Sequence, residues 1–192
     1  MTGARGLDRK HIQILLRSQP RYRLQAILGN GTFGTVAEAL DTAKRRSVAL
    51  KFVAGGAKMR NLEREVLNHR ALNHPHIIEY KKCFPVPGYL VIVMEHANGG
   101  DLFDFVARRG RLSENDARTM FQQLILAVDY CHRKGVASRD IKCENLLLQY
   151  HEDRARCPLL KLCDFGYSCR EAVQSDPTLG RSFCLSPLFF GR

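Results

Sequence analysis

A change of periodicity near residue 98 divides this sequence of 192 residues into two parts. From Tyr22 to Val53, and again up to Met94, short runs rich in β-branched and aromatic residues alternate with glycine and proline, which is typical of antiparallel strands. After Asn98-Gly99-Gly100, apolar residues recur at helical spacing. Strands first and helices second predict an α+β fold, with a small β-rich lobe and an α-helical lobe.

The pattern also predicts the individual elements. Strands are expected at residues 22–28, 36–41, 47–53, 77–83 and 89–94, with a turn at 85–88 between the last two. Residues 58–72 form an amphipathic helix, which ends before Pro75 because the residue preceding a proline disfavours helical geometry. A short helix is expected at 102–108, and Ser113 to Asp116 form a capping box for a helix reaching about Lys134. Residues 1–20 are predicted to be flexible or to form a short helix.

Composition limits the class of protein. The chain is 45% hydrophobic, enough for the core of one globular domain, and it has no apolar run of membrane-spanning length and no signal-peptide core. The seven cysteines include no C-x-x-C pair, which favours free thiols in a reducing compartment. We therefore expect a cytoplasmic or nuclear protein, or one found in both compartments, with no membrane partner.

The formal net charge of +11 raises the question of nucleic-acid binding. The basic residues are spread along the chain and form no stripe interleaved with aromatic residues. Charge alone gives only non-specific affinity, so we expect no specific nucleic-acid partner.

Four motifs follow one another in the order that phosphoryl transfer from ATP requires. They are the glycine-rich stretch 29–36, the strand residues 48–51, the polar segment 140–145 and the Asp-Phe-Gly segment 164–166. A lone G-x-G-x-x-G is weak evidence, but no βαβ unit follows it here, which excludes a dinucleotide-binding fold. Glycine at 29, 31 and 34 would let backbone N–H groups approach phosphate oxygens.

The whole set resembles the protein kinases, and the resemblance implies roles for its residues. Asp140 would accept or orient the proton of the substrate hydroxyl, and Lys142 would steady the transferring phosphate. Asn145 and Asp164 would hold Mg²⁺, a cation that prefers oxygen ligands. An Asp-x-Lys-x-x-Asn segment favours serine and threonine over tyrosine as acceptors.

Lys51 and Glu65 would form an ion pair that places the lysine on the α- and β-phosphates of ATP. For either residue alone, a solvated surface charge would be the better interpretation. The expected ATP-binding set consists of Leu28, Gly29, Asn30, Gly31, Thr32, Phe33, Gly34, Val36, Ala49, Lys51, Met94, Glu95, Ala97, Asp101, Glu144 and Leu147. Within it, Val36, Ala49 and Leu147 would contact adenine, Glu95 and Ala97 would offer backbone hydrogen bonds, and Asp101 would meet the ribose. Met94 would guard the back of the pocket, although singly it could be an ordinary core residue.

Within the kinases, the sequence resembles the sucrose-non-fermenting-related protein kinases of plants and green algae, subclass two. The stretches that carry this resemblance are 68–75, 93–103, 121–124 and 163–168. It implies phosphorylation of serine or threonine in substrate proteins during stress signalling, and control by an activating kinase or phosphatase. Ser175 is the best candidate for an activating phosphorylation site, although it could equally be a solvated loop serine.

The resemblance also implies a division of the chain. Residues 1–21 are a lead-in, and 22–178 a partial protein kinase domain with an N-lobe (22–94), a hinge (95–98) and a partial C-lobe (99–178). Residues 179–192 form an atypical tail, because they do not match the family pattern. The fold expected is therefore a complete antiparallel β N-lobe with its helix, followed by an incomplete α-helical C-lobe.

Two further differences from the family pattern leave open whether the chain transfers phosphate. Ser138 stands where the family has a histidine that packs against Phe165, and the loop 149–158 is long. The first hypothesis is an ATP-dependent serine/threonine protein kinase. The alternatives are a truncated, weak or inactive kinase-like module that binds ATP or a partner, and a chain with no folded product.

Overall fold

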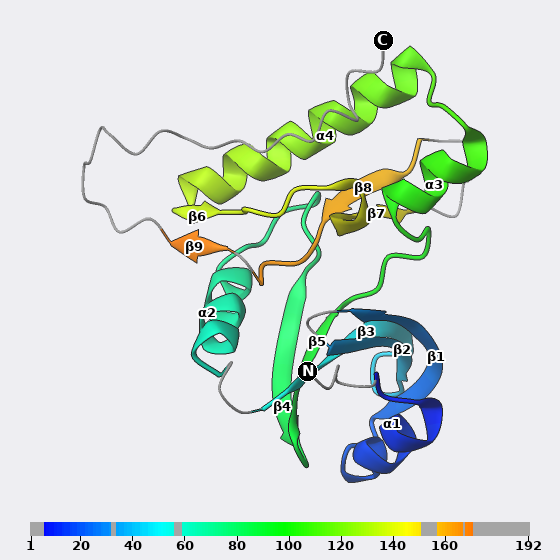
Figure 1. Cartoon of the computed structure of the whole chain (residues 1–192), viewed down its shortest axis with the longest axis vertical. Helices are drawn as coiled ribbons and strands as arrows, with labels where there is room; N and C mark the ends of the chain where they lie inside the picture. The colour runs from blue at the N-terminus through cyan, green and yellow to red at the C-terminus, as the bar shows by residue number, and fades with distance from the viewer. Residues whose placement is uncertain (1–5, 32–33, 56–58, 151–156, 167, 171–192) are drawn as a thin grey trace, which may run out of the picture. The chain divides into compact units, whose positions relative to one another are not determined.

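The computed structural model describes residues 6–31, 34–55, 59–150, 157–166 and 168–170. They fall into two compact units, coloured by residue number in Figure 1. Unit 1 comprises Met1–Glu63 and Glu79–His96, and unit 2 comprises Arg64–Ile78 and Ala97–Arg192. Helix α2 (Met59–Arg70) contributes its first residues to unit 1 and its remaining residues to unit 2. Thr32, Phe33, Ser175 and the segment 179–192 lie outside the described residues.

Unit 1 is built on a five-stranded sheet in which neighbouring strands are antiparallel, in the order β1-β2-β3-β5-β4. The strands are β1 (Tyr22–Gly31), β2 (Gly34–Asp41), β3 (Arg46–Ala54), β4 (Tyr80–Val86) and β5 (Tyr89–Glu95). Every second residue of β2 is buried, as expected for a strand with one face on a core. The central strand β3 is buried continuously from Val48 to Val53.

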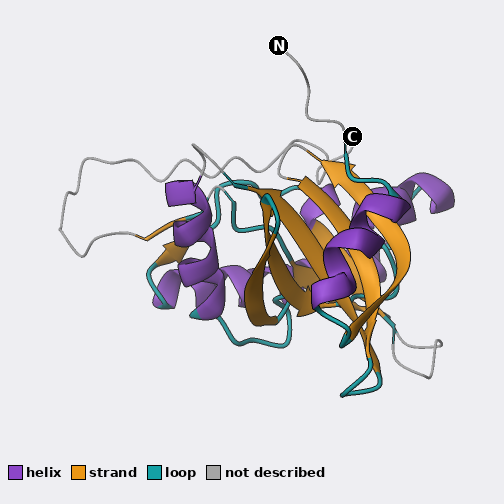
Figure 2. Cartoon of the chain, turned by 90° about the horizontal axis from the view of Figure 1, so that it is seen from below, coloured by secondary structure: helices purple, strands orange, loops and turns teal. Residues whose placement is uncertain are grey.

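The lead-in contains helix α1 (Arg9–Leu15), which lies against the sheet in Figure 2. Its N-cap is Asp8, whose carboxylate accepts a hydrogen bond from the N–H of His11 at 2.8 Å. Ile12 and Leu16 are buried in the same hydrophobic cluster as Leu50 and Val93 of the sheet. The helical alternative is therefore the one observed, and the lead-in forms part of the core of unit 1.

The prediction of a strand at 77–83 was wrong at both ends. Strand β4 begins at Tyr80, because Ile77 and Ile78 belong to unit 2, where the N–H of Ile78 donates to Leu162 O at 3.0 Å. The strand then continues through Pro85 to Val86, inside the segment expected to turn. A proline is tolerated there because β4 is an edge strand of the sheet.

Unit 2 combines two helices with short strands. Its elements are α3 (Leu102–Arg109), α4 (Glu114–Arg133), β6 (Val136–Ala137), β7 (Leu146–Gln149), β8 (Leu159–Leu162) and β9 (Cys169–Arg170). Strands β7 and β8 pair antiparallel, so the long loop predicted at 149–158 joins the two strands of a hairpin. The N-cap half of the predicted capping box is confirmed, since Ser113 Oγ accepts from the N–H of Asp116 at 3.1 Å.

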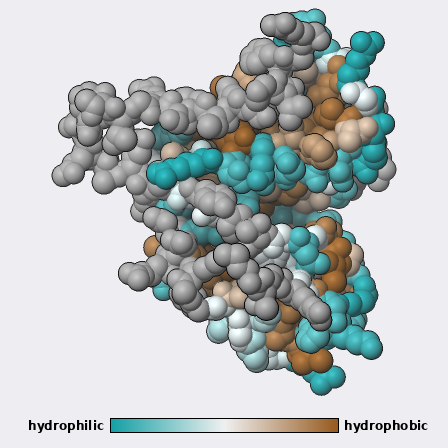
Figure 3. All heavy atoms as spheres, viewed as in Figure 1, coloured by the Kyte–Doolittle hydropathy of each residue, from teal (hydrophilic) through white to brown (hydrophobic). Residues whose placement is uncertain are grey.

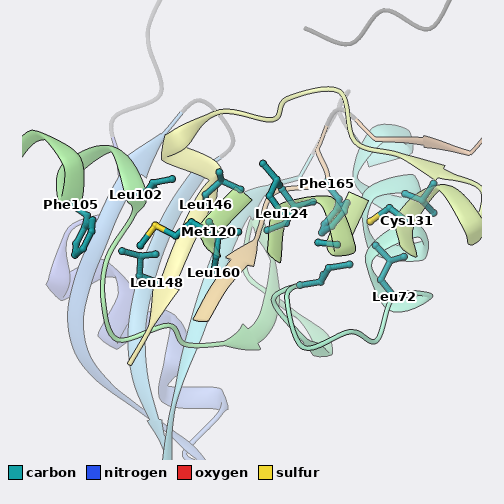
Figure 4. Close-up of a cluster of buried hydrophobic side chains, with 14 residues drawn as sticks. Leu72, Leu102, Phe105, Met120, Leu124, Cys131, Leu146, Leu148, Leu160 and Phe165 are labelled. Atoms are coloured by element: carbon teal, nitrogen blue, oxygen red, sulfur yellow. The ribbon is translucent and has the colours of Figure 1, made fainter. Parts of the chain in front are cut away.

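One hydrophobic cluster holds unit 2 together (Figure 4). Helix α4 supplies Met120, Leu124, Ala127 and Cys131 to it, and the hairpin supplies Leu146, Leu148, Leu160 and Leu162. Other large apolar side chains of the helices are exposed; they are Phe103, Phe121, Ile125 and Leu126. Figure 3 shows hydrophobic patches on one face of this unit. Cys83, Cys131, Cys143 and Cys157 are free thiols, as expected. None of the described helices is both long enough and apolar enough to span a membrane.

An ion pair joins the residue before β1 to the end of β2. Nε and Nη2 of Arg21 donate to the two carboxylate oxygens of Asp41 at 2.8 and 2.7 Å, and the backbone N–H of Ala43 donates to Oδ1 at 3.1 Å. The hydrogen bond from Arg21 lowers the pKa of Asp41 to about 2. Because the folded pKa is depressed, this stabilisation is present above the unfolded pKa of about 3.9 and is lost as the pH falls through about 2.

We expect Arg21→Met to lower the free energy of unfolding at pH 7, because the Asp41 carboxylate, whose side chain is only 3% exposed, would lose its charged partner. It should also flatten the loss of stability between about pH 4 and pH 2. Urea denaturation at several pH values measures both effects. Arg118→Met, which breaks an exposed pair with Glu114, is the control and should change stability by less than about 1 kcal/mol. Identical acid profiles for Arg21→Met and the wild type would show that the pair has no such role.

Candidate functional site

The glycine-rich turn connects β1 and β2, which stay paired to its ends: Gly29 faces Val36, Asn30 faces Thr35 and Gly31 faces Gly34. Gly34 has φ 128°, and a Cβ at this position would overlap the carbonyl oxygen of Phe52. A Cβ at Gly29 or Gly31 would meet no atom of a described residue within 4 Å. Packing within the protein therefore requires glycine at 34 only, and the space beside the other two backbones remains available for a ligand.

The residues expected around the nucleotide share one face of the sheet. Val36 pairs with Lys51, and Ala49 pairs with Met94. Because side chains alternate along a strand and paired residues lie on the same side, these four side chains project from one face. The core residues Leu50 and Phe52 and helix α1 occupy the opposite face.

Lys51 lies in the middle of β3 and is only 6% exposed. Glu65 lies on α2 in unit 2 and is also buried. Because the two residues belong to different units, their ion pair stays a prediction.

Glu95 closes β5, and both its backbone N–H and its side chain interact with Glu79. The N–H donates to Glu79 O at 2.9 Å, and Glu95 Oε2 accepts from the N–H of Glu79 at 3.1 Å. A backbone contact of Glu95 with adenine would therefore have to use its carbonyl oxygen. Ala97, the other residue expected to contact adenine through its backbone, is buried in unit 2.

Two of the predicted catalytic residues and one predicted metal ligand meet in unit 2. Asn145 ends the 3-10 turn Cys143–Asn145, and its Nδ2 donates to Asp140 O at 2.8 Å and to Asp140 Oδ2 at 2.9 Å. Lys142 Nζ lies 2.8 Å from the same Oδ2. The hydrogen bond to Asp140 raises the pKa of Lys142. The five-residue spacing of Asp140 and Asn145 thus corresponds to a closed hydrogen-bonded turn.

The Asp-Phe-Gly segment is tied to this turn, since the N–H of Cys163 donates to Asn145 O at 2.9 Å. Asp164 has φ 61°, which is uncommon for a residue other than glycine, and its Oδ1 accepts from the N–H of Gly166 at 3.0 Å. Such a backbone costs about 1–3 kcal/mol and is found most often at functional sites. The two predicted metal ligands, Asn145 and Asp164, are therefore anchored to adjoining backbone segments.

Asp101 and Leu147 lie side by side, joined by an isolated antiparallel bridge between the residue before α3 and β7. Asp101 is also the N-cap of α3, with Oδ1 accepting from the N–H of Asp104 at 2.8 Å. One carboxylate oxygen thus has a structural role, and the other is not hydrogen-bonded to a described residue. Glu144, the neighbour of Asn145, is exposed.

Two buried residues that the sequence reasoning did not assign to the site hold the Asp-Phe-Gly segment against the end of α2. Asn68 Nδ2 donates to Ser168 Oγ at 2.9 Å, and that hydroxyl donates to Phe165 O at 2.6 Å. The ring of His69 lies 5.0 Å from the ring of Phe165, and its Nε2 lies 2.6 Å from Ile78 O. The spacing offered a signal, because residues three and four positions after Glu65 share its face of the helix.

Ser138, the substitution for the expected histidine, has a buried hydroxyl for which no partner exists among the described residues. An unsatisfied buried polar group costs about 1–3 kcal/mol. We expect Ser138→Ala to raise the free energy of unfolding by about 1 kcal/mol, measured by urea denaturation. Ser113→Ala is the matched control and should lower stability by about 1 kcal/mol, because it removes the cap of α4. If Ser138→Ala destabilises the protein as much as the control does, the hydroxyl has a partner in solution.

Comparison with known proteins shows which family this chain is similar to. Residues 22–191 match the family described as protein kinase domain. The serine/threonine-protein kinases SRK2E of Arabidopsis thaliana and SAPK9 of Oryza sativa subsp. japonica are each 42% identical over 176 residues, covering 90% of this chain and 48% of the relative. SRK2A of Physcomitrium patens is 42% identical over 175 residues, covering 90% and 49%.

The chain therefore spans about half the length of the curated relatives it matches. The predicted resemblance to subclass two of the sucrose-non-fermenting-related kinases is confirmed by these relatives. Because the family match includes the β-sheet of unit 1 and both polar segments of unit 2, the chain belongs to the protein kinase domain family.

Proposed function

We propose that this chain binds Mg²⁺ and ATP and transfers the γ-phosphoryl group to serine or threonine hydroxyls of proteins. The observation that carries the proposal is the hydrogen-bonded turn of Asp140, Lys142 and Asn145, attached through Cys163 to the segment that begins at Asp164. Its polar groups are the kinds that phosphoryl transfer requires at this spacing. The relatives are named serine/threonine-protein kinases, which supports the same chemistry here.

Asp140 is suited to receive the substrate hydroxyl. Its Oδ2 is held by Asn145 and Lys142, whereas Oδ1 has no hydrogen bond to a described residue. A fixed carboxylate with one open oxygen can orient the hydroxyl and accept its proton as the bond to phosphorus forms. Lys142, which lies 2.8 Å from Asp140 Oδ2, would balance charge on the transferring group.

Asn145 and Asp164 fit a divalent cation. Asn145 directs its amide nitrogen to Asp140, which leaves its side-chain oxygen for a metal. Mg²⁺ keeps several waters and phosphate oxygens and needs only one or two protein ligands. Consistent with so small a set, no group of three or more His, Cys, Asp or Glu side chains that could hold a metal occurs in the described residues. When bound, the cation would neutralise charge on the phosphates.

On the nucleotide side, we infer that the backbone of the glycine-rich turn cradles the phosphates and that Lys51 contacts them. The open space at Gly29 and Gly31 supports this role. Resemblance to the subclass further supports a role in stress signalling, with Ser175 as a site of activation by another kinase or reversal by a phosphatase.

Ser138 favours one alternative, a module that binds ATP without transferring phosphate. Ser138, whose hydroxyl has no partner among the described residues, directly follows β6 and lies two residues before Asp140. Loss of packing there would loosen Asp140 without affecting the glycine-rich turn. The two functions differ in whether phosphate reaches an acceptor.

The test is transfer of labelled γ-phosphate from ATP to a generic basic protein in the presence of Mg²⁺. Asp164→Ala should abolish transfer, because the cation loses its carboxylate ligand. Asp129→Ala is the matched control, since this aspartate lies exposed on α4 in a pair with Arg133. Equal transfer by Asp164→Ala and the wild type would refute the proposal.

A further inference from the structure

The segment before α1 contacts the glycine-rich turn, although it lies outside the part of the chain that matches the kinase family. The backbone N–H of Leu7 donates to Thr35 Oγ1 at 2.8 Å. That hydroxyl in turn donates to Asn30 Oδ1 at 2.6 Å. Thr35 is 2% exposed, and Asn30 is its cross-strand partner, one pair away from the glycines that close the hairpin. One hydroxyl thus joins the lead-in to both strands of the turn.

Gly6 makes the second contact with the same pair of residues. A Cβ at Gly6 would overlap the side-chain amide of Asn30. A larger residue at this position therefore requires the Asn30 side chain to shift, which should weaken its hydrogen bond with Thr35. The close approach of Gly6 shows that the lead-in packs directly on the residue it helps to hold.

A rigid element carries these contacts. Asp8 caps α1 immediately after Leu7, and Ile12 is completely buried in the core of unit 1. Arg9 Nη1 also donates to the carbonyl oxygen of Gln25 on β1 at 2.9 Å. The position of Gly6 and Leu7 is therefore fixed by the helix that follows them.

The lead-in contacts the turn from the side opposite to the proposed nucleotide. Thr35 alternates with Val36 along β2, and Val36 shares the face of Lys51. A residue whose side chain projects from the other face can hold the turn without occupying the space beside Gly29 and Gly31.

We propose that Gly6, Leu7 and Thr35 form a brace that restrains the glycine-rich turn and thereby raises the affinity for ATP. Glycine-rich backbone has much conformational freedom to lose, and ordering it before binding reduces the cost of binding. The restraint depends only on contacts within unit 1, whereas its effect on affinity rests on the proposed function. Thr35 and Gly6 act as positioning residues, since they act through Asn30.

Two substitutions break the brace at different points. Thr35→Val keeps the side-chain shape and removes the shared hydroxyl, and Gly6→Ala displaces Asn30 while leaving that hydroxyl in place. Thr42→Val is the matched control, because the Thr42 hydroxyl donates to Arg21 O at 3.0 Å, beyond the opposite ends of β1 and β2. Two readouts are needed: hydrogen exchange of the peptide covering residues 29–36, and the Kd and KM for ATP in the presence of Mg²⁺.

Both substitutions should speed exchange of that peptide and raise Kd and KM for ATP about fivefold, the equivalent of one hydrogen bond, with kcat changed less than about twofold. The control should change neither readout. Unchanged exchange in both variants would disprove the brace, and faster exchange with unchanged Kd would disprove its effect on affinity. If the wild type binds no ATP, the proposed function fails, and exchange alone then decides whether the brace exists.

Discussion

Replacement of Asp140 by asparagine is expected to lower kcat for phosphoryl transfer by about 10²- to 10⁴-fold, the usual contribution of a positioned general base. Asparagine preserves the size of the side chain and an oxygen that can accept from Asn145 and Lys142. It removes the charge that attracts the substrate proton. Steady-state kinetics with saturating ATP, together with the Kd for ATP, measure this effect.

The Kd is the internal control for Asp140→Asn. Asp140 lies in unit 2 and is expected to contact the hydroxyl acceptor, so ATP should bind within about twofold of the wild-type affinity. Asp129→Asn, on the exposed face of α4, should leave both constants unchanged. Full kcat in Asp140→Asn would remove Asp140 from the proposed chemistry, and lost ATP binding would indicate a structural role.

Replacement of Phe165 by alanine is expected to lower the free energy of unfolding of unit 2 by about 3–5 kcal/mol. The side chain is 1% exposed, belongs to the hydrophobic cluster of unit 2 and contacts the ring of His69. A domain has only about 5–15 kcal/mol of stability, so this loss is a large part of the total. Urea denaturation followed by circular dichroism measures it.

Phe103→Ala is the matched control for Phe165→Ala, which leaves a cavity in the core. Phe103 lies on α3 and is 50% exposed, so its truncation leaves no enclosed cavity and should cost less than about 1 kcal/mol. Equal losses in the two variants would mean that Phe165 is not packed in solution as it is in the structure. Phe165→Leu, which keeps more of the buried volume, should fall between them.

Much of the fold could be predicted from local patterns. Alternation and glycine punctuation located β1, β2, β3 and β5, and the capping serine located the start of α4 within one residue. Strands β6 to β9 were not predicted, because two to four residues are too few for a period to be recognised. Ile77 and Ile78 were misassigned to β4, since their apolar character is the same whether they join a strand or are buried in unit 2.

The residues of the candidate site also differ in how far the sequence could predict their contacts. Asp140, Lys142 and Asn145 are close in sequence, so the motif alone predicted that they would lie together. Asn68 and Ser168 are 100 positions apart, and Leu7 and Thr35 are 28 apart, so only the fold brings each pair into contact. A local pattern carries no information about such long-range pairs.

The most direct test of the proposed kinase activity measures ATP binding and phosphate transfer on one preparation of the 192-residue chain. The melting temperature with and without ATP and Mg²⁺ reports binding, and mass spectrometry of an acceptor protein reports transfer. The proposal predicts a higher melting temperature and new phosphoserine or phosphothreonine, with the latter absent for Asp140→Asn. A higher melting temperature with no phosphorylated acceptor would contradict it and identify a module that binds ATP without transferring phosphate.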